Sequence, residues 1–184
     1  CFGQANPARQ AEPNMKQRTA ACPACGAPVE FKVGSSLVTV CEFCNSAVAR
    51  TDKKIEDHGK VADLIETQSR LRLGLTGRFG RKRFSIVGRV QYAHPAGGIW
   101  DEWYLAFPGD RWGWLTQAQG RNYLMFQRQL SSSIRLPEFD DLSLGVRVRL
   151  GKSEFEVTEK GVANAAAAEG DIPWDFRPNA EHRF

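Results

Sequence analysis

Hydrophobic and polar residues alternate with a period of two over much of the chain beyond residue 70. The alternation is clear in segments 83–92, 144–150 and 154–158. Gly- and Pro-containing turns separate these from three further predicted strands, over 99–107, 111–118 and 123–127. Such a pattern is typical of antiparallel sheet with one face on a core and the other in water. It predicts a mainly β fold.

An internal repeat supports this prediction. A shift of 71 residues places Leu73-Gly74, Gly80 and Phe84 on Leu144-Gly145, Gly151 and Phe155. Each copy is predicted to be a strand, a Gly-centred turn and a second strand with a core Phe. Continuing the shift places Trp174 opposite Trp103. We therefore expect a duplicated small antiparallel β domain, either a curled sheet or a partly open barrel, because closure protects sheet edges.

Four of the five cysteines form two CxxC pairs, Cys22 with Cys25 and Cys41 with Cys44. Fifteen residues separate the pairs, which matches the spacing of a zinc ribbon. Residues 29–40 are expected to form the hairpin between them. Four thiolates complete a tetrahedral shell, so the pattern predicts one structural Zn²⁺.

The four cysteines have two other possible uses. A single CxxC can be a redox dithiol, and a secreted protein can pair four sulfurs as disulfides. Redox CxxC motifs begin a helix after a strand, and neither pair has that setting. Gly26 and Asn45, each directly after a CxxC, suit the tight turns that aim N–H groups at metal-bound sulfur. Zinc is the favoured interpretation.

The changes of pattern divide the chain into six segments. Val61, Leu64 and Ile65 have helical spacing and predict one short helix that begins near Gly59. The predicted organisation is a disordered lead-in (1–20), the zinc ribbon (21–49), a linker with the short helix (50–69), the first β unit (70–130), a linker (131–143) and a second, incomplete β unit (144–184).

Composition adds few constraints on function. No apolar run approaches the roughly 18 residues of a membrane span. Thiolate zinc ligands favour a reducing compartment, so we expect a cytoplasmic protein. The formal charge of +4 becomes smaller when four thiolates bind zinc. It gives no strong argument for a polyanionic partner.

The aromatic residues offer one candidate binding surface. Exposing several Trp side chains would cost solubility, so most are expected in the core. Trp112 and Trp114 should share a face of their strand, and Trp100 and Trp103 should face oppositely. The sharper hypothesis is a partner-binding surface composed of Trp100, Asp101, Glu102 and Trp103.

A basic run offers a second candidate. Segment 70–89 holds seven positive residues and no acid. Basic strands beside aromatic rings can hold single-stranded nucleic acid, and the candidate contacts are Arg78, Arg81, Lys82 and Arg83. However, glutamates occupy the related strand of the second unit, so the two faces could instead complement each other or a protein.

Catalytic patterns are weak. His58, His94 and His182 are scattered, and no nucleophile elbow or phosphate-binding loop is present. A small-molecule substrate is therefore not expected, and an unrecognised enzyme ranks third among the hypotheses.

Several motifs together resemble a bacterial family with domain of unknown function 4178. They are Cys22-Pro-Ala-Cys25, Leu73-Gly-Leu-Thr-Gly77, 84–92, 100–105, Gly113-Trp-Leu115, 155–159 and 168–173. The resemblance implies a cytoplasmic β-rich domain behind an N-terminal zinc ribbon, with an accessory role at the membrane. It supplies no catalytic residues. The favoured function is a non-catalytic binding or assembly module with a protein partner, and the alternative is a nucleic-acid-binding module.

Overall fold

The computed structural model describes residues 18–52, 54–118, 121–127 and 129–184. Strands dominate these ranges, and the one helical element found there is a 3₁₀ turn, η1 (Phe139–Asp141). The prediction of a mainly β protein is confirmed. The strands are β1 (Arg18–Ala21), β2 (Pro28–Phe31), β3 (Val38–Val40), β4 (Ser46–Arg50), β5 (Ile55–Lys60), β6 (Thr76–Phe79), β7 (Lys82–Ala93), β8 (Ile99–Phe107), β9 (Arg111–Ala118), β10 (Arg121–Met125), β11 (Arg147–Leu150), β12 (Ser153–Glu156), β13 (Val162–Ile172) and β14 (Glu181–Arg183).

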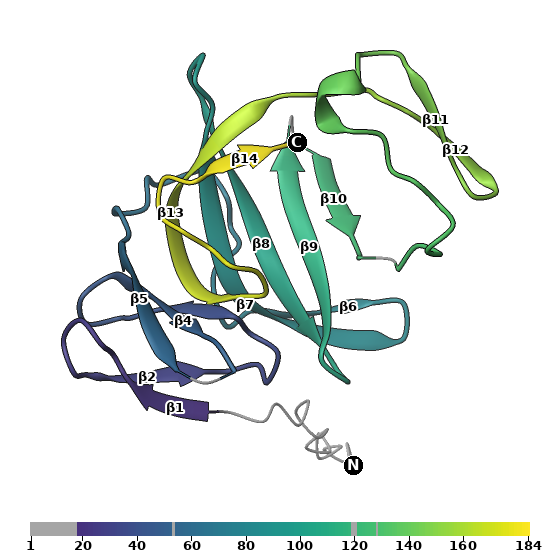
Figure 1. Cartoon of the computed structure of the whole chain (residues 1–184). Coiled ribbons are helices and arrows are strands. Elements are labelled where there is room, and N and C mark those ends of the chain that lie inside the picture. The colour runs from purple at the N-terminus through teal and green to yellow at the C-terminus, as the bar shows by residue number, and fades with distance from the viewer. Residues whose placement is uncertain (1–17, 53, 119–120, 128) are drawn as a thin grey trace, which may run out of the picture.

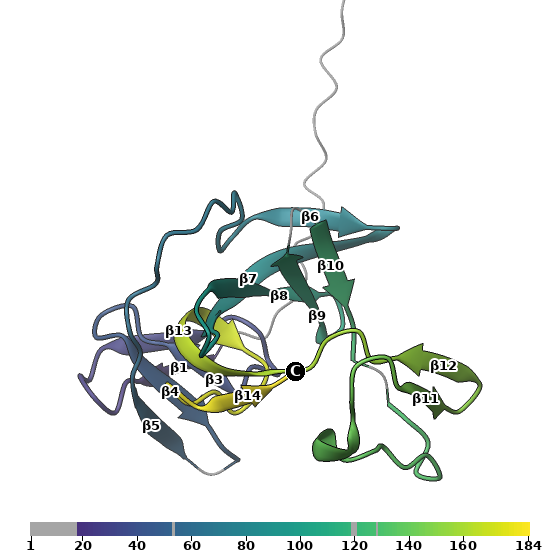
Figure 2. The same ribbon diagram turned by 90° about the horizontal axis from the view of Figure 1, so that it is seen from above.

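One antiparallel sheet of ten strands forms the body of the molecule. Its order is β10-β9-β8-β7-β13-β3-β4-β5, with β6 paired to β7 and β14 paired to β13 (Figure 1). Seen from above, the sheet curls around β13 and β14 (Figure 2). The end strands β10 and β5 do not pair with each other. The sheet is therefore curled and does not close into a barrel.

The two faces of the sheet bury different apolar clusters. Trp103 is 1% exposed and packs with Leu105 and Phe107 on one face. Trp100 packs against the cluster on the other face, together with Trp112 and Trp114. The predicted opposite orientation of Trp100 and Trp103 is confirmed, as is the shared face of Trp112 and Trp114.

Strand β13 joins β3, β4 and β5 to the rest of the sheet. It pairs with β7 on one side and through Asp171 and Ile172 with β3 on the other. Its crossing with β7 is very close, because a Cβ added at Gly88 would lie 1.8 Å from the Asp171 carbonyl oxygen. Gly170, opposite Gly88, has φ +70°, a conformation that side chains disfavour. The crossing therefore requires glycine on both strands.

The predicted helix near residues 59–68 is absent from the described chain. Strand β5 ends at Lys60, and the following residues up to β6 form no helix; Ala62 makes an isolated parallel bridge with Ala167 of β13. The Gln91 side chain accepts the Ile65 N–H (2.9 Å) and donates to the Ile65 carbonyl (3.0 Å). A helix would use those backbone groups internally, so this distant side chain favours the extended form.

The 71-residue repeat holds for one hairpin. β6 with the start of β7 has the same register as β11 with β12: Gly77 lies opposite Phe84, and Val148 opposite Phe155. The flanking backbone bonds also correspond. Beyond the hairpin the copies diverge, because Trp103 lies in β8 and Trp174 lies in the segment after β13. Trp103 and Trp174, which the shift aligns, therefore occupy different structural positions.

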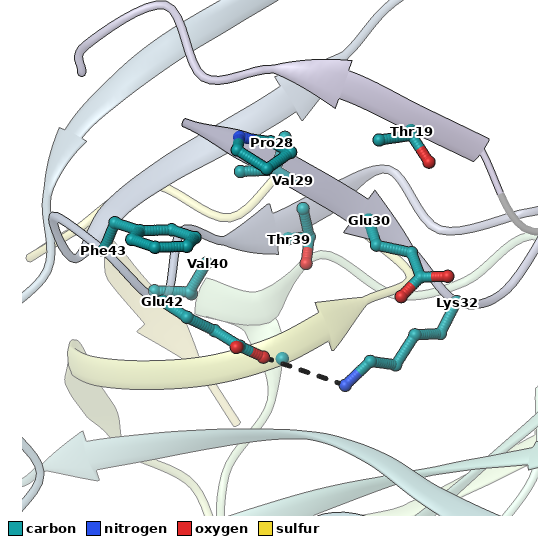
Figure 3. Close-up of a pocket in the computed structure, with 10 residues that line it drawn as sticks. Thr19, Pro28, Val29, Glu30, Lys32, Thr39, Val40, Glu42 and Phe43 are labelled. Carbon is teal, nitrogen blue, oxygen red and sulfur yellow. Dashed lines mark ion pairs between the residues drawn. The ribbon is translucent and has the colours of Figure 1, made fainter. Parts of the chain in front are cut away.

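The N-terminal strands form two short hairpins with a pocket beside them. Of the predicted disordered lead-in, residues 1–17 lie outside the described ranges, and Arg18–Ala20 belong to β1. A pocket of about 350 Å³ lies along β2 (Figure 3). Lys32 and Glu42 approach to 3.9 Å at this pocket, and Phe43 beside them is 71% exposed.

Candidate metal centre

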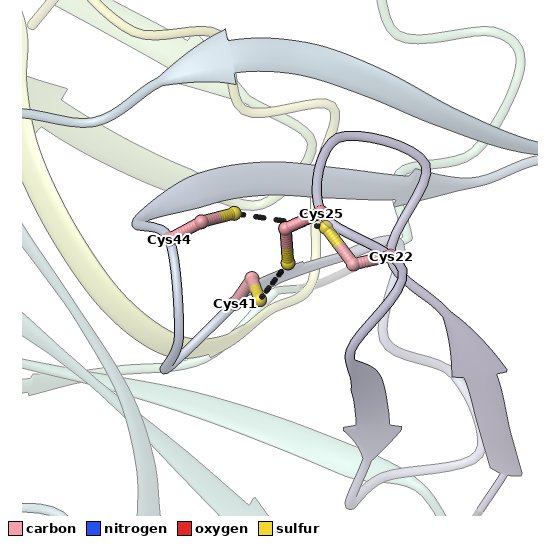
Figure 4. A group of neighbouring side chains, drawn as sticks. All are labelled: Cys22, Cys25, Cys41 and Cys44. Atoms are coloured by element: carbon pink, nitrogen blue, oxygen red, sulfur yellow. Dashed lines mark hydrogen bonds between the residues drawn. The ribbon is translucent and has the colours of Figure 1, made fainter.

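Each CxxC pair lies in the turn of its own hairpin. Cys22 and Cys25 lie between β1 and β2, and Cys41 and Cys44 lie between β3 and β4 (Figure 4). The predicted hairpin over 29–40 is wrong, because β2 pairs with β1 and β3 pairs with β4. Two separate turns therefore bring the four sulfurs together.

The two turns have the same backbone bonding. Gly26 donates its N–H to the Cys22 carbonyl (2.8 Å), and Asn45 donates to the Cys41 carbonyl (2.9 Å). Both residues have positive φ, 78° at Gly26 and 55° at Asn45. Gly and Asn tolerate this conformation best, which explains their place directly after each pair.

The sulfur geometry fits a tetrahedral metal. Cys22 Sγ lies 3.8 Å from Cys44 Sγ, and Cys25 Sγ lies 3.8 Å from Cys41 Sγ. All four sulfurs lie within 4.8 Å of one another. A tetrahedral ion with Zn–S bonds of about 2.3 Å separates its ligands by about 3.8 Å. The cluster can therefore hold a metal ion.

Neighbouring groups and burial shift the pKa values of the cysteine thiols in opposite directions. The Ser46 hydroxyl, hydrogen-bonded to the Cys44 sulfur, lowers the pKa of Cys44 to about 6. Burial raises the pKa of Cys22. Because metal binding requires thiolates, the donor at Cys44 favours the ligating form, and the ion itself must offset the burial of Cys22.

A buried carboxylate on β13 holds the loop between β2 and β3 against the sheet. Asp171 of β13 accepts bonds from the Val33 N–H (2.9 Å), the Ser36 hydroxyl (2.6 Å) and the Thr39 hydroxyl (3.0 Å). Burial raises its pKa despite these donors. The loop between β2 and β3 is thus held by a residue more than 130 positions away. Sequence reasoning missed this contact because no local pattern signals it.

The candidate aromatic surface is not present as predicted. Asp101 and Trp103 are both buried. Arg89 binds Asp101 with two bonds of 2.9 Å, and its guanidinium lies 4.8 Å from the centre of the Trp103 ring. Glu102 and Trp100 point to the opposite face, so the four residues do not form one exposed patch.

The basic candidates lie on the hairpin of β6 and β7, far along the chain from the cysteines. Arg78, Arg81, Lys82 and Arg83 are all exposed. Arg78 lies directly opposite Arg83, so two like charges face each other across the strands.

The histidines do not converge. His58 Nδ1 lies 3.0 Å from the Phe176 carbonyl oxygen, and His94 lies in the turn between β7 and β8. His182 packs against the Tyr92 ring. Within the described residues, Cys22, Cys25, Cys41 and Cys44 form the group with metal-ligand geometry.

The fold and the four sulfurs define a class: a β-rich protein whose N-terminal hairpins carry a four-cysteine cluster, with a geometry that could hold a metal ion, packed on an antiparallel sheet. The chain belongs to the family with the domain of unknown function DUF4178, whose family model matches residues 72–184. This match begins after the cysteine cluster. No curated protein and no solved structure shows significant similarity to the chain. In the described ranges no helix is long and apolar enough to cross a membrane.

Proposed function

We propose that this protein is a non-catalytic zinc-ribbon module that binds a partner protein through the β11–β12 hairpin. The single observation that carries the proposal is the uncovered apolar face of this hairpin. The family resemblance supports a setting in which the module is accessory to a membrane-associated bacterial system and acts in the cytoplasm.

The ion is proposed to be Zn²⁺ in a structural role. Four thiolates are the ligand set that structural zinc prefers, and they leave no coordination position for a substrate. The apolar cluster around the cysteines is small, with Val29, Phe31 and Val48 as its other buried members. Metal binding of roughly 10–16 kcal/mol can hold such a small unit together.

The partner-binding surface is proposed from the repeat. In the first copy, Leu73, Leu75 and Phe84 pack against the buried cluster of Ile86, Trp103, Leu105 and Phe107. The corresponding Leu144, Val146 and Phe155 of the second copy are 67%, 40% and 53% exposed. Exposed apolar clusters of this kind mark interaction sites. The first copy shows what chemistry covers such a face: an apolar, aromatic-rich sheet surface.

Metal analysis and chelation test the zinc assignment. We expect one equivalent of zinc per chain, and loss of protection from hydrogen exchange in 18–50 when the zinc is chelated. Cys41→Ser should have the same effect, whereas the matched substitution Ser131→Ala on an exposed turn should have none. A metal-free protein with an intact, protected ribbon would contradict the proposal.

Site-specific photo-crosslinking tests the partner surface. A benzophenone amino acid is placed at position 155 in one variant and at 154, on the opposite face of the hairpin, in another. We expect a specific adduct with another protein from position 155 and none from position 154. Equal labelling from both positions, or adducts only between copies of this chain, would overturn the proposal.

A nucleic-acid-binding module is the second candidate, and the opposed pair Arg78 and Arg83 favours it. Like charges directly opposite in a sheet are destabilising, so such a pair suggests an absent anion. Arg149 and Glu154 occupy the same positions in the second hairpin. Retention on single-stranded DNA or RNA should fall with salt and with Arg78→Gln, but not with Arg149→Gln. No retention at low salt would exclude it.

A further inference from the structure

Strand β2 has one edge without a hydrogen-bonded neighbour. It pairs with β1 on its other side and with no further strand in the described chain. The Cys22 N–H donates to the Ala27 carbonyl (2.8 Å), and hydrogen-bonded pairs recur at every second residue of an antiparallel ladder. Val29 and Phe31 therefore bond to β1, whereas the N–H and the carbonyl of Glu30 point to the free edge.

Glu30 is the residue of β2 that can offer a complete pair of backbone bonds to a new strand. Pro28, the other residue that points to this edge, has no N–H. No backbone partner of the Glu30 N–H or carbonyl lies among the residues that the structure describes. The Glu30 carboxylate is exposed and forms no ion pair with any of them, whereas Lys32 is paired with Glu42. The edge thus presents one donor, one acceptor and one unpaired negative charge.

The pocket of about 350 Å³ lies beside this edge, and Glu30 is one of its lining residues (Figure 3). Val29 and Val40 line the pocket from β2 and β3 and are buried. Phe43, from the turn between β3 and β4, also lines it and is largely exposed. The volume is at the lower end of the range for ligand pockets, so side chains of a bound segment fit better than a large ligand. An apolar floor and an uncovered aromatic ring therefore adjoin the free edge.

We propose that β2 and this pocket bind an extended peptide segment of another protein, which adds a strand antiparallel to β2. In this mode of recognition a free strand edge supplies the main-chain bonds, and a neighbouring pocket selects the side chains. A Lys or Arg of the segment lies opposite Glu30, because the carboxylate there has no counter-charge. Successive side chains of a strand point to opposite faces, so the next residue places an apolar side chain against Val29 and Phe43. The segment therefore alternates basic and apolar residues.

Binding of the peptide fluorescein-(Val-Lys)₃-amide to the full chain tests the proposal, with fluorescence anisotropy as the readout. We expect saturable binding. Methylation of the Lys backbone nitrogens should weaken it about 10-fold or more, because the N–H bonded to the Glu30 carbonyl is lost. Methylation of the Val backbone nitrogens keeps the same charge and composition and should leave the affinity unchanged, because these N–H groups point away from β2. Equal affinity of the two methylated peptides would overturn the proposal.

Substitutions in the protein locate the binding site. Glu30→Lys should weaken binding of the Val-Lys peptide about 3- to 10-fold and strengthen binding of the matching Val-Glu peptide. Phe43→Ala should weaken binding of the Val-Lys peptide about 10-fold, because an aromatic contact in the pocket is lost. Phe155→Ala removes another exposed ring, on the β11–β12 hairpin, and should leave the affinity unchanged. Unchanged affinity in both Glu30→Lys and Phe43→Ala would overturn the proposal.

Two further measurements complete the test. An unchanged melting temperature and metal content show that each variant is folded, so lost binding cannot reflect unfolding. Sedimentation of the chain alone should show a monomer. A dimer that Phe43→Ala dissociates would mean that a second copy fills the pocket, and it would overturn the proposal. This inference goes beyond the proposed function, because the β11–β12 hairpin takes no part. Peptide binding without a crosslink from position 155 would contradict the proposed function alone.

Discussion

The two repeated hairpins share a backbone but differ in their surroundings. Gly74 and Gly145 both donate their N–H groups across the strands at 2.8 Å, to Ile86 and Val157. Yet the first hairpin continues into the long strand β7 and buries its apolar face. The second pairs only with itself and leaves that face in water.

This difference shows which properties are local. Turn glycines and the alternation of side chains are enough to determine the hairpin and its register. Whether the apolar face is buried depends on neighbours that are far away in the chain. The proposed partner surface follows from that second property.

The largest effect is expected from truncating the Phe that the two hairpins share, Phe84 in the first and Phe155 in the second. Phe84 packs against Phe107 with ring centres 5.4 Å apart, so Phe84→Ala should cost about 3 kcal/mol of unfolding free energy. Phe155→Ala should cost no more than about 1 kcal/mol, because its ring is exposed. Chemical denaturation measures both. Similar losses would show that the second hairpin is covered within the chain.

The next effect concerns the residue opposite each ring. A Cβ at Gly77 would lie 2.4 Å from the Phe84 ring, so Gly77→Val should displace that ring and cost about 1–3 kcal/mol. Val148→Gly, which makes the second hairpin resemble the first, should cost about 1 kcal/mol or less. Thermal melts of the two variants check this. A tolerated Gly77→Val would show that Phe84 can repack freely.

Alanine substitutions at Gly74 and Gly145 should strain their turns to a similar degree. Gly74 and Gly145 have φ of 83° and 79°, so alanine at either position should strain its turn by about 1 kcal/mol. Hydrogen exchange should detect both changes, whereas global unfolding should detect only Gly74→Ala. A global loss with Gly145→Ala would mean that the second hairpin contributes to the main core.

The smallest effect concerns charge. Arg83→Glu places an acid opposite Arg78, as Glu154 lies opposite Arg149 in the second hairpin. We expect a gain of about 0.2–1 kcal/mol, reduced by salt. Denaturation at low and high ionic strength measures it. No gain at low salt would show that Arg78 and Arg83 already avoid each other.

Local pattern predicted the regular strands and the approach of the four cysteine sulfurs well. Segments 99–107 and 111–118 are β8 and β9 at the expected bounds, and the four cysteine sulfurs come together. Strand β13 was missed, because its run of alanines shows neither alternation nor β preference. Of those alanines, Ala165, Ala167 and Ala168 pair with β7 and are buried.

The remaining errors have a common physical origin. The helix prediction near Gly59 failed because the Gln91 side chain binds the backbone of Ile65 from another strand. The buried Asp171 likewise depends on residues that are distant in sequence. Contacts of this kind carry no local signature, whereas turn chemistry and metal-ligand spacing do.

The position of β13 between β3 and β7 has a consequence for biosynthesis. The ribbon strands leave the ribosome early, but their hydrogen-bonding partner is completed only when Ile172 has been made. Until then the edges of β3 and β7 that will pair with β13 remain unpaired, and unpaired strand edges tend to associate with other chains. Binding of a metal ion by the cysteines of the nascent chain would hold β3 in its hairpin with β4 while the rest of the polypeptide is made.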